Sequence, residues 1–245
     1  MNVVIIIPAR YGSSRYEGKP LIMINKIPLI IRVVKKCVLA LDRDNVYVAT
    51  DDKRIADLVK GYGYKFIMTS KNNLTGTDRV AEASTKIKAD IFINVQGDEP
   101  LIKPSDIIKV INYKKKEKNY IICAYCKLQS DENENRRTIP KVVFNEKNEL
   151  LYISRNSIPV SKKNNVRINY FKQVCIYAFT KNELKEFKSF NRKSFLENIE
   201  DIEILRFFEL NKKIKMVKVS NSAVAVDEPS DRKKVEQILN EKKKN

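Results

Sequence analysis

The chain has 245 residues, 43% of them hydrophobic, a formal net charge of +18 and no histidine. That apolar fraction is enough for a full core, which excludes wholesale disorder, and the length suits one large α/β domain. Without histidine, the chain cannot use a histidine-based catalytic triad, an imidazole base or a histidine-ligated zinc ion.

Strands and helices are predicted to alternate over the first hundred residues. The run at residues 3–7 is β-branched and ends in Pro8, which is typical of a buried strand in a parallel sheet. Further strands are predicted at 46–49, 65–68 and 91–95, and the helices between them at 28–41, 53–61 and 77–88. Such alternation predicts βαβ units with right-handed crossovers.

The second half is predicted to be richer in strands. They are expected at 120–128, 141–144, 150–154, 174–179, 214–219 and 223–226, with helices at 195–210 and 231–241. We therefore expect a single domain over residues 1–245, in which an α/β core carries a β-rich elaboration at about 120–195.

Composition also limits the compartment and the partners. The longest apolar run, at residues 3–7, is far shorter than the ~20 residues of a membrane span, and no basic segment precedes it. The four cysteines are scattered, which favours a reducing compartment, so we expect a cytoplasmic protein with no membrane partner. The positive charge is mostly lysine spread along the chain without an interleaved aromatic stripe, and we expect no nucleic-acid partner.

Polar clusters follow three of the apolar runs, at the sheet edge where doubly wound folds bind ligands. The first cluster contains Arg10, Ser13 and Arg15, with Lys19 after it. Small residues let backbone N–H groups approach phosphate oxygens, and the cations add positive charge. We therefore favour phosphate binding over an exposed basic loop.

The other two clusters each present a carboxylate. Asp98 follows the fourth strand in the sequence QGDEP, and Asp227 follows an apolar run near the C-terminus. Either can hold Mg²⁺ beside substrate phosphates, and either can instead cap a following turn or helix. The residues alone indicate an enzyme that uses a phosphate-rich substrate and a divalent metal ion.

Two further features suit a nucleotide and a sugar. Gly76 lies between two hydroxyl residues just before a predicted helix, which suits contact with a base or a ribose. Arg155 and Tyr177 suit an anionic, sugar-like second substrate, although an arginine on the surface and a tyrosine in the core are equally open interpretations.

The motifs resemble, in order, those of the 3-deoxy-D-manno-octulosonate (Kdo) cytidylyltransferases. The matching blocks span nearly the whole chain: PARYGSSR at 8–15, GKPL at 18–21, VATD at 48–51, GTDR at 76–79, NVQGDEP at 94–100, YISR at 152–155 and VD at 226–227. The resemblance implies a Rossmann-like nucleotidyltransferase fold with a mixed sheet and a β-rich insertion. It also implies transfer of CMP from CTP to Kdo with release of pyrophosphate, by a homodimer that supplies lipopolysaccharide or capsule assembly.

The resemblance further implies roles for individual residues. Lys19, Asp98 and Asp227 are expected to be catalytic, with Mg²⁺ held by the two aspartates. The triphosphate is expected to contact Arg10, Ser13, Arg15 and Lys19. The nucleotide and sugar side is expected to be lined by Gly76, Thr77 and Arg79. The acid sugar is expected to contact Gln96, Arg155, Tyr177 and Glu203.

Two positions depart from the family pattern, both on the expected acceptor side. Gln173 stands where the family commonly has a histidine, and Ile204 stands where it has a glutamine. Removing a buried hydrogen bond from a binding site typically weakens binding by ~1–3 kcal/mol unless the bonded partner also changes. Ordinary Kdo remains the expected acceptor, and the alternatives are a modified Kdo such as 8-amino-Kdo, another acid sugar, or a small phosphonate or phosphate.

Other classes of protein are weighed against this interpretation. Transferases that use UTP or dTTP usually open with a glycine-rich loop, which residues 8–10 (PAR) do not match. A basic nucleic-acid-binding module is a remote alternative. A member that binds CTP without transferring it is disfavoured because Lys19, Asp98 and Asp227 are intact.

Overall fold

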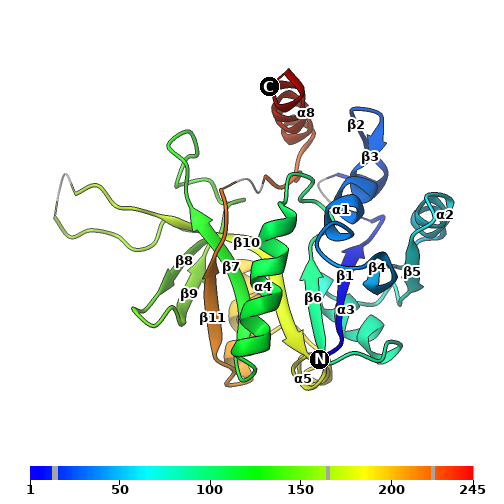
Figure 1. The fold of residues 1–245 in the computed structure, drawn as a ribbon. Coiled ribbons are helices and arrows are strands. Elements are labelled where there is room, and N and C mark those ends of the chain that lie inside the picture. The colour runs from blue at the N-terminus through cyan, green and yellow to red at the C-terminus, as the bar shows by residue number, and fades with distance from the viewer. Residues whose placement is uncertain (13–15, 164–165, 222–223, 245) are drawn as a thin grey trace.

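A mixed, mostly parallel sheet forms the centre of the computed structural model, which describes residues 1–12, 16–163, 166–221 and 224–244 (Figure 1). Its main strands run in the order β11-β7-β10-β6-β1-β4-β5. Of these, only β10 runs antiparallel to its neighbours. The bounds are β1 Val3–Ala9, β4 Val46–Thr50, β5 Lys65–Met68, β6 Ile91–Val95, β7 Ile121–Lys127, β10 Phe171–Thr180 and β11 Ile214–Lys218. The predicted α/β fold with a mixed sheet is confirmed.

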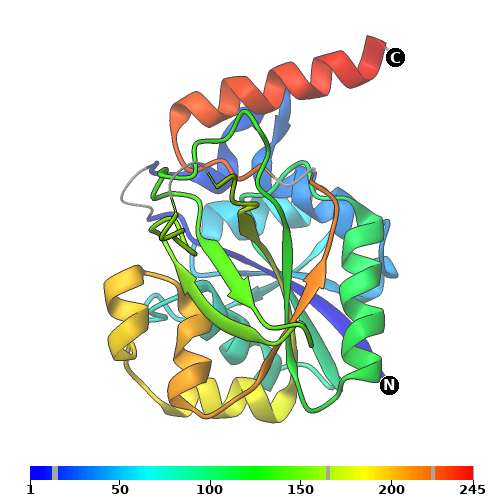
Figure 2. The same cartoon turned by 90° about the vertical axis from the view of Figure 1, so that its left-hand side faces the viewer.

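Helices cover both faces of this sheet because its central strands are apolar on both faces. In β1, Ile5 and Ile7 face one apolar cluster, while Val4 and Ile6 face the other. The first face is covered by α1 (Leu29–Cys37), α2 (Lys53–Gly61) and α4 (Pro104–Lys116), and the second by α3 (Gly76–Thr85), α5 (Lys181–Ser189) and α7 (Arg206–Glu209). Figure 2 shows α4 on one side of the sheet and the yellow and orange helices on the other.

A third, smaller apolar cluster fixes the C-terminal helix. Helix α8 (Pro229–Lys244) packs Val235 against Ile24 and Leu29, next to the hairpin of β2 (Met23–Ile24) and β3 (Ile27–Pro28). Both views place this helix across the end of the sheet where β1 and β6 terminate (Figures 1 and 2). Helix α8 is therefore placed to contribute side chains at the sheet edge where β1 and β6 terminate.

The range 120–195 predicted for the β-rich elaboration is too broad. Strands β7 and β10 belong to the central sheet, and α5 lies within the same range. What extends from the sheet is the hairpin of β8 (Lys141–Phe144) and β9 (Leu150–Ser154), which joins the end of β10. Helices α4 and α5 and the β2–β3 hairpin were not predicted.

The prediction of a single helix at 195–210 is wrong. Helix α6 (Phe195–Glu200) ends at Asp201, whose φ of 49° places it in the left-handed region. A 3₁₀ turn, η3 (Glu203–Leu205), and the short α7 follow it. The described part of the strand predicted at 223–226, residues 224–226, is not a strand either. Among the described residues, no helix is long and apolar enough to cross a membrane.

Gly97 allows β1 and β6 to approach each other closely where they end. A Cβ atom at this position would lie 2.9 Å from the carbonyl oxygen of Pro8 and 3.1 Å from Cδ1 of Ile30. Because a backbone oxygen cannot move aside, we expect Gly97→Ala to lower the free energy of unfolding by ~1–3 kcal/mol in urea titrations.

Gly61→Ala is the matched control, since a Cβ atom there would meet nothing within 4 Å at the end of α2. We expect this control to be neutral or to stabilise the protein by up to ~1 kcal/mol. Equal stability of the two variants would contradict the close approach at Gly97.

Candidate active site

Two adjoining cavities open at the end of the sheet where β1 and β6 terminate. The larger has a volume of about 450 Å³ and the smaller about 230 Å³. They share a boundary formed by Gln96, Asp98, Asp201, Glu203 and Asp227. This is the sheet edge at which doubly wound folds bind ligands.

Lys19 joins the two predicted metal-binding carboxylates at this boundary. Its Nζ lies 2.6 Å from Oδ2 of Asp98 and 3.6 Å from Oδ1 of Asp227. The backbone holds the two segments together, because the N–H of Val226 donates to the carbonyl oxygen of Asp98 at 2.9 Å. The carboxylate of Asp231 accepts the N–H groups of residues 227 and 228, so Asp231 serves as the turn cap there.

Two carboxylates that converge on one ammonium group provide a donor set for a divalent cation. The described residues contain no cluster of three or more histidine, cysteine or acidic side chains able to hold a metal ion. A cation at Asp98 and Asp227 would therefore take its remaining ligands from water and substrate phosphates, as Mg²⁺ commonly does. The two aspartates fit such an ion.

The smaller cavity has the features of a phosphate-binding site. It is lined by Arg10 after β1, by Lys19 in η1 (Lys19–Leu21), and by Thr75 and Gly76 at the start of α3. A helix N-terminus attracts anions, and the two cations add to this field. Ser13 and Arg15, predicted to belong to the same loop, lie outside the described residues.

Gly76 brings α3 against the boundary of the two cavities. A Cβ atom here would lie 2.8 Å from Nε2 of Gln96, so a larger residue would displace that side chain. The side chain of Thr75 caps the helix in a reciprocal pair with Asp78. Gly76, the predicted nucleotide contact, lines the smaller cavity.

Two of the predicted nucleotide contacts are buried and hydrogen-bonded within the protein. Arg79 is 3% exposed and donates to Asp51 at 2.9 Å and to Thr69 at 2.6 Å. Thr77 is 1% exposed, and its backbone N–H donates to Glu203 at 2.8 Å. Arg79 reaches the edge of the smaller cavity, whereas Thr77 lines neither cavity.

Gln96 and Glu203 form one hydrogen-bonded unit between the cavities. Nε2 of Gln96 donates to Oε1 of Glu203 at 2.7 Å, and Oε2 of Glu203 accepts the N–H of Thr77. Burial raises the pKa of Glu203 above its ordinary value. The pair offers a fixed set of polar atoms to a ligand on either side.

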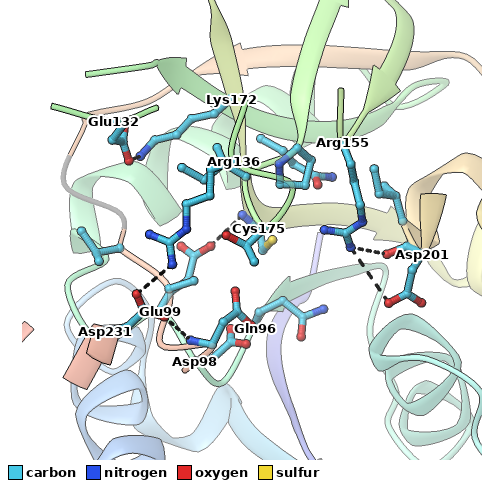
Figure 3. Close-up of a pocket in the computed structure, with 18 of the residues that line it drawn as sticks. Gln96, Asp98, Glu99, Glu132, Arg136, Arg155, Lys172, Cys175, Asp201 and Asp231 are labelled. Carbon is cyan, nitrogen blue, oxygen red and sulfur yellow. Dashed lines mark hydrogen bonds and ion pairs between the residues drawn. The ribbon is translucent and has the colours of Figure 1, made fainter. Parts of the chain in front are cut away.

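Arg155 and Tyr177, the predicted acid-sugar contacts, both line the larger cavity. The guanidinium of Arg155 donates to the carbonyl oxygens of Arg137 at 2.8 Å and Asp201 at 2.9 Å. Burial raises the pKa of Tyr177 well above its ordinary value, so its phenol is neutral. The protein's own hydrogen bonds thus hold Arg155 in place before any ligand binds (Figure 3).

The two positions that depart from the family pattern have different surroundings. Gln173 lines the larger cavity, is 9% exposed and directs Nε2 toward Sγ of Cys123 at 3.8 Å. Ile204 is fully buried in the apolar cluster around Phe207 and lines neither cavity. This corrects the expectation that Ile204 faces the acceptor: in η3 its neighbour Glu203 lines the cavities, while Ile204 packs into the core.

Glu99 is a residue that the sequence analysis did not single out, although it lies in the NVQGDEP block. It is 4% exposed and lines the larger cavity, where Oε1 accepts the N–H of Cys175 at 3.0 Å (Figure 3). Burial and the neighbouring charge of Asp98 raise the pKa of Glu99 to about 7. Only the placement of β10 beside this segment shows that the carboxylate lines the cavity, and no local sequence signal carries that placement.

Comparisons with known proteins agree with this geometry. The profile of the cytidylyltransferase family matches residues 4–214. An 8-amino-3,8-dideoxy-manno-octulosonate cytidylyltransferase from a Shewanella strain (W3-18-1) is 39% identical over 98% of this chain and 99% of its own. A 3-deoxy-manno-octulosonate cytidylyltransferase from Escherichia coli is 35% identical over 97% of this chain and 96% of its own.

Solved structures extend the comparison. The structure of a CMP:2-keto-3-deoxy-manno-octonic acid synthetase in complex with CTP has a TM-score of 0.90 and 34% identity, covering 99% of this chain and all of that one. A 4-diphosphocytidyl-2C-methyl-D-erythritol synthase from Anaerococcus prevotii shares the fold, with a TM-score of 0.62 and 14% identity over 98% of each chain.

Proposed function

The chain belongs to the cytidylyltransferase family, and on that premise we propose that it transfers CMP from CTP to an eight-carbon acid sugar. The acceptor is Kdo or its 8-amino form, and pyrophosphate is the second product. The observation that carries this proposal is the convergence of Lys19, Asp98 and Asp227 where the two cavities meet. Relatives named for these two sugars cover almost the whole chain, which supports the same reaction.

Each cavity takes one substrate in this proposal. The smaller one receives CTP, with its triphosphate near Arg10, Lys19 and the N-terminus of α3. The larger one receives the acid sugar, with Arg155 near its carboxylate. The α-phosphorus and the sugar hydroxyl then meet at the boundary, beside the two aspartates. Ser13 and Arg15 remain proposed triphosphate contacts.

The reaction needs positioning and charge neutralisation more than covalent catalysis. The anomeric oxygen of the sugar bonds to the α-phosphorus, the bond to the departing pyrophosphate breaks in line, and the hydroxyl proton is released. Lys19 places a positive charge beside the reacting phosphate, and Gln96 with Glu203 fixes the orientation of both substrates. No step in this sequence requires an imidazole, in agreement with a chain that has no histidine.

Cytidylyltransferases of this kind generally use a divalent metal ion, and we propose that it is Mg²⁺ held by Asp98 and Asp227. When bound there, the ion would neutralise phosphate charge and lower the pKa of the attacking hydroxyl. We also propose a cytoplasmic homodimer whose product supplies the assembly of lipopolysaccharide or capsule.

Pyrophosphate release from the purified chain tests the proposed function. With Mg²⁺ and both acid sugars present, we expect release with CTP and less than ~1% of that rate with ATP, GTP or UTP, since the cytosine edge must be matched by buried polar groups. Chelation by EDTA is expected to stop the reaction. Steep salt-dependent binding to DNA or RNA with no release of pyrophosphate would instead support the nucleic-acid-binding alternative.

A further inference from the structure

One carboxylate oxygen in the wall of the larger cavity has no hydrogen-bond partner among the described residues. Oε2 of Glu99 is buried and unpaired, while Oε1 of the same group accepts the N–H of Cys175. Burying a carboxylate oxygen without a partner is unfavourable, so such groups are normally paired with a cation or a hydrogen-bond donor. A ligand in this cavity can supply the missing partner.

The cations that line the cavity are engaged with other groups. Lys172 forms an ion pair with Glu132, and Arg136 contacts Asp231 at 3.2 Å (Figure 3). Arg155 is bound to the carbonyl oxygens of residues 137 and 201, and Lys234 contacts the carboxylate of residue 131 at 3.4 Å.

The charge balance of the cavity differs from that of the chain. The whole chain carries +18, yet acidic side chains outnumber basic ones by eight to four in the lining of the larger cavity. A divalent ion at Asp98 and Asp227, together with the Lys19 ammonium that lies between them, would offset three of the acidic groups. The remaining excess is unfavourable for a purely anionic acceptor and favourable for one that also carries a positive charge.

The residue at position 173 adds no positive charge to offset the acidic excess of this cavity. A histidine, which the family commonly has here, can carry a positive charge, whereas Gln173 is neutral and directs its amide toward Sγ of Cys123. The chain therefore lacks a side chain that in other members could place a cation on this wall. Among the described residues, the buried carboxylate of Glu99 is left without a direct ion pair.

We propose that the larger cavity binds an acceptor that bears a primary ammonium group, with Glu99 as the counter-ion of that group. This inference rests on the proposed function and selects, between the two acid sugars, the 8-amino form. A primary alkyl amine is protonated at neutral pH, so it brings both the charge and the N–H donors that Oε2 lacks. Kdo itself offers a neutral hydroxyl at the same place.

The first test leaves the protein unchanged and varies the acceptor. With CTP and Mg²⁺ at a pH of about 7.5, we expect kcat/KM to be at least ~30-fold higher for 8-amino-Kdo than for Kdo or for N-acetylated 8-amino-Kdo, since only the first can pair with the buried charge. Equal values for the three sugars would overturn the inference while leaving the proposed function standing. Turnover of none of them would refute the proposed function itself.

Calorimetric binding of the same sugars separates recognition from chemistry. We expect 8-amino-Kdo to bind the protein more tightly than Kdo or the N-acetylated sugar. An absence of preference in this experiment would overturn the inference independently of the kinetic result.

The second test removes the charge. Glu99→Gln keeps the shape of the side chain, and we expect it to lower the ratio of kcat/KM for 8-amino-Kdo over Kdo by at least ~30-fold. Glu149→Gln is the matched control, because Glu149 lies at the β8–β9 hairpin away from both cavities, and we expect it to leave the ratio unchanged. A Glu99→Gln variant that slows both acceptors equally would show that Glu99 serves the reaction centre or the fold and not the ammonium group.

Discussion

Asp98→Asn is expected to lower the rate of pyrophosphate release by at least ~10³-fold, because the stabilisation of charge that it removes amounts to several kcal/mol. The amide keeps the size of the side chain but removes the negative charge that faces Lys19 at 2.6 Å. It also removes one of the two carboxylates that fit a divalent ion. The measurement is the steady-state rate at saturating CTP and acceptor, together with the melting temperature of the variant.

The matched control is Asp52→Asn, the same chemical change near the end of a neighbouring strand. Asp52 follows β4, caps α2 by accepting the N–H of Arg54 at 2.9 Å, and lines neither cavity. Asparagine is as good an N-cap as aspartate, so we expect activity and stability close to those of the unchanged protein. A folded Asp98→Asn variant with more than about a tenth of the normal rate would exclude Asp98 as a metal ligand.

The central sheet could be predicted because each of its first four strands is a largely apolar run. A strand buried on both faces needs apolar residues at nearly every position, and residues 3–7 and 91–95 show this pattern directly. The segment 195–210, predicted as one helix, forms three pieces because Asp201 adopts a left-handed conformation that its local sequence does not demand. Tertiary contacts, including the hydrogen bond from Arg155 to the carbonyl oxygen of Asp201, favour that break.

The site could be predicted only in part. Asp98 and Asp227 lie far apart in the sequence, so their convergence follows from the fold and from the family resemblance and not from spacing. The charge of Arg79 predicts a ligand contact, and only the fold shows that this residue of the smaller cavity is also held by the carboxylate of Asp51. Glu99 was not predicted as a site residue. Its role in the cavity wall becomes visible only in the fold, where β10 binds one of its carboxylate oxygens and the other has no partner among the described residues.

Arg206 ties together two helix N-termini on the second face of the sheet. It is fully buried and donates to Asp78 at 2.7 and 3.0 Å and to Glu197 at 2.8 and 2.7 Å. Asp78 belongs to the reciprocal cap of α3, and Glu197 belongs to that of α6. The same guanidinium lies 3.8 Å from the centre of the Phe187 ring, so packing and charge act together.

Arg206→Met is therefore expected to lower the free energy of unfolding by ~3–5 kcal/mol, because it leaves two buried carboxylates without their cation. Urea titration followed by circular dichroism gives this quantity. The half-buried pair of Arg232 with Glu236 on α8 provides the control, since Arg232→Met is expected to change stability by less than ~1 kcal/mol. Any folded fraction of Arg206→Met should bind CTP more weakly, because α3 presents Thr75 and Gly76 to the smaller cavity and its N-terminal cap would lose its anchor. Equal loss of stability in both variants would mean that the Arg206 network contributes no more than this half-buried ion pair.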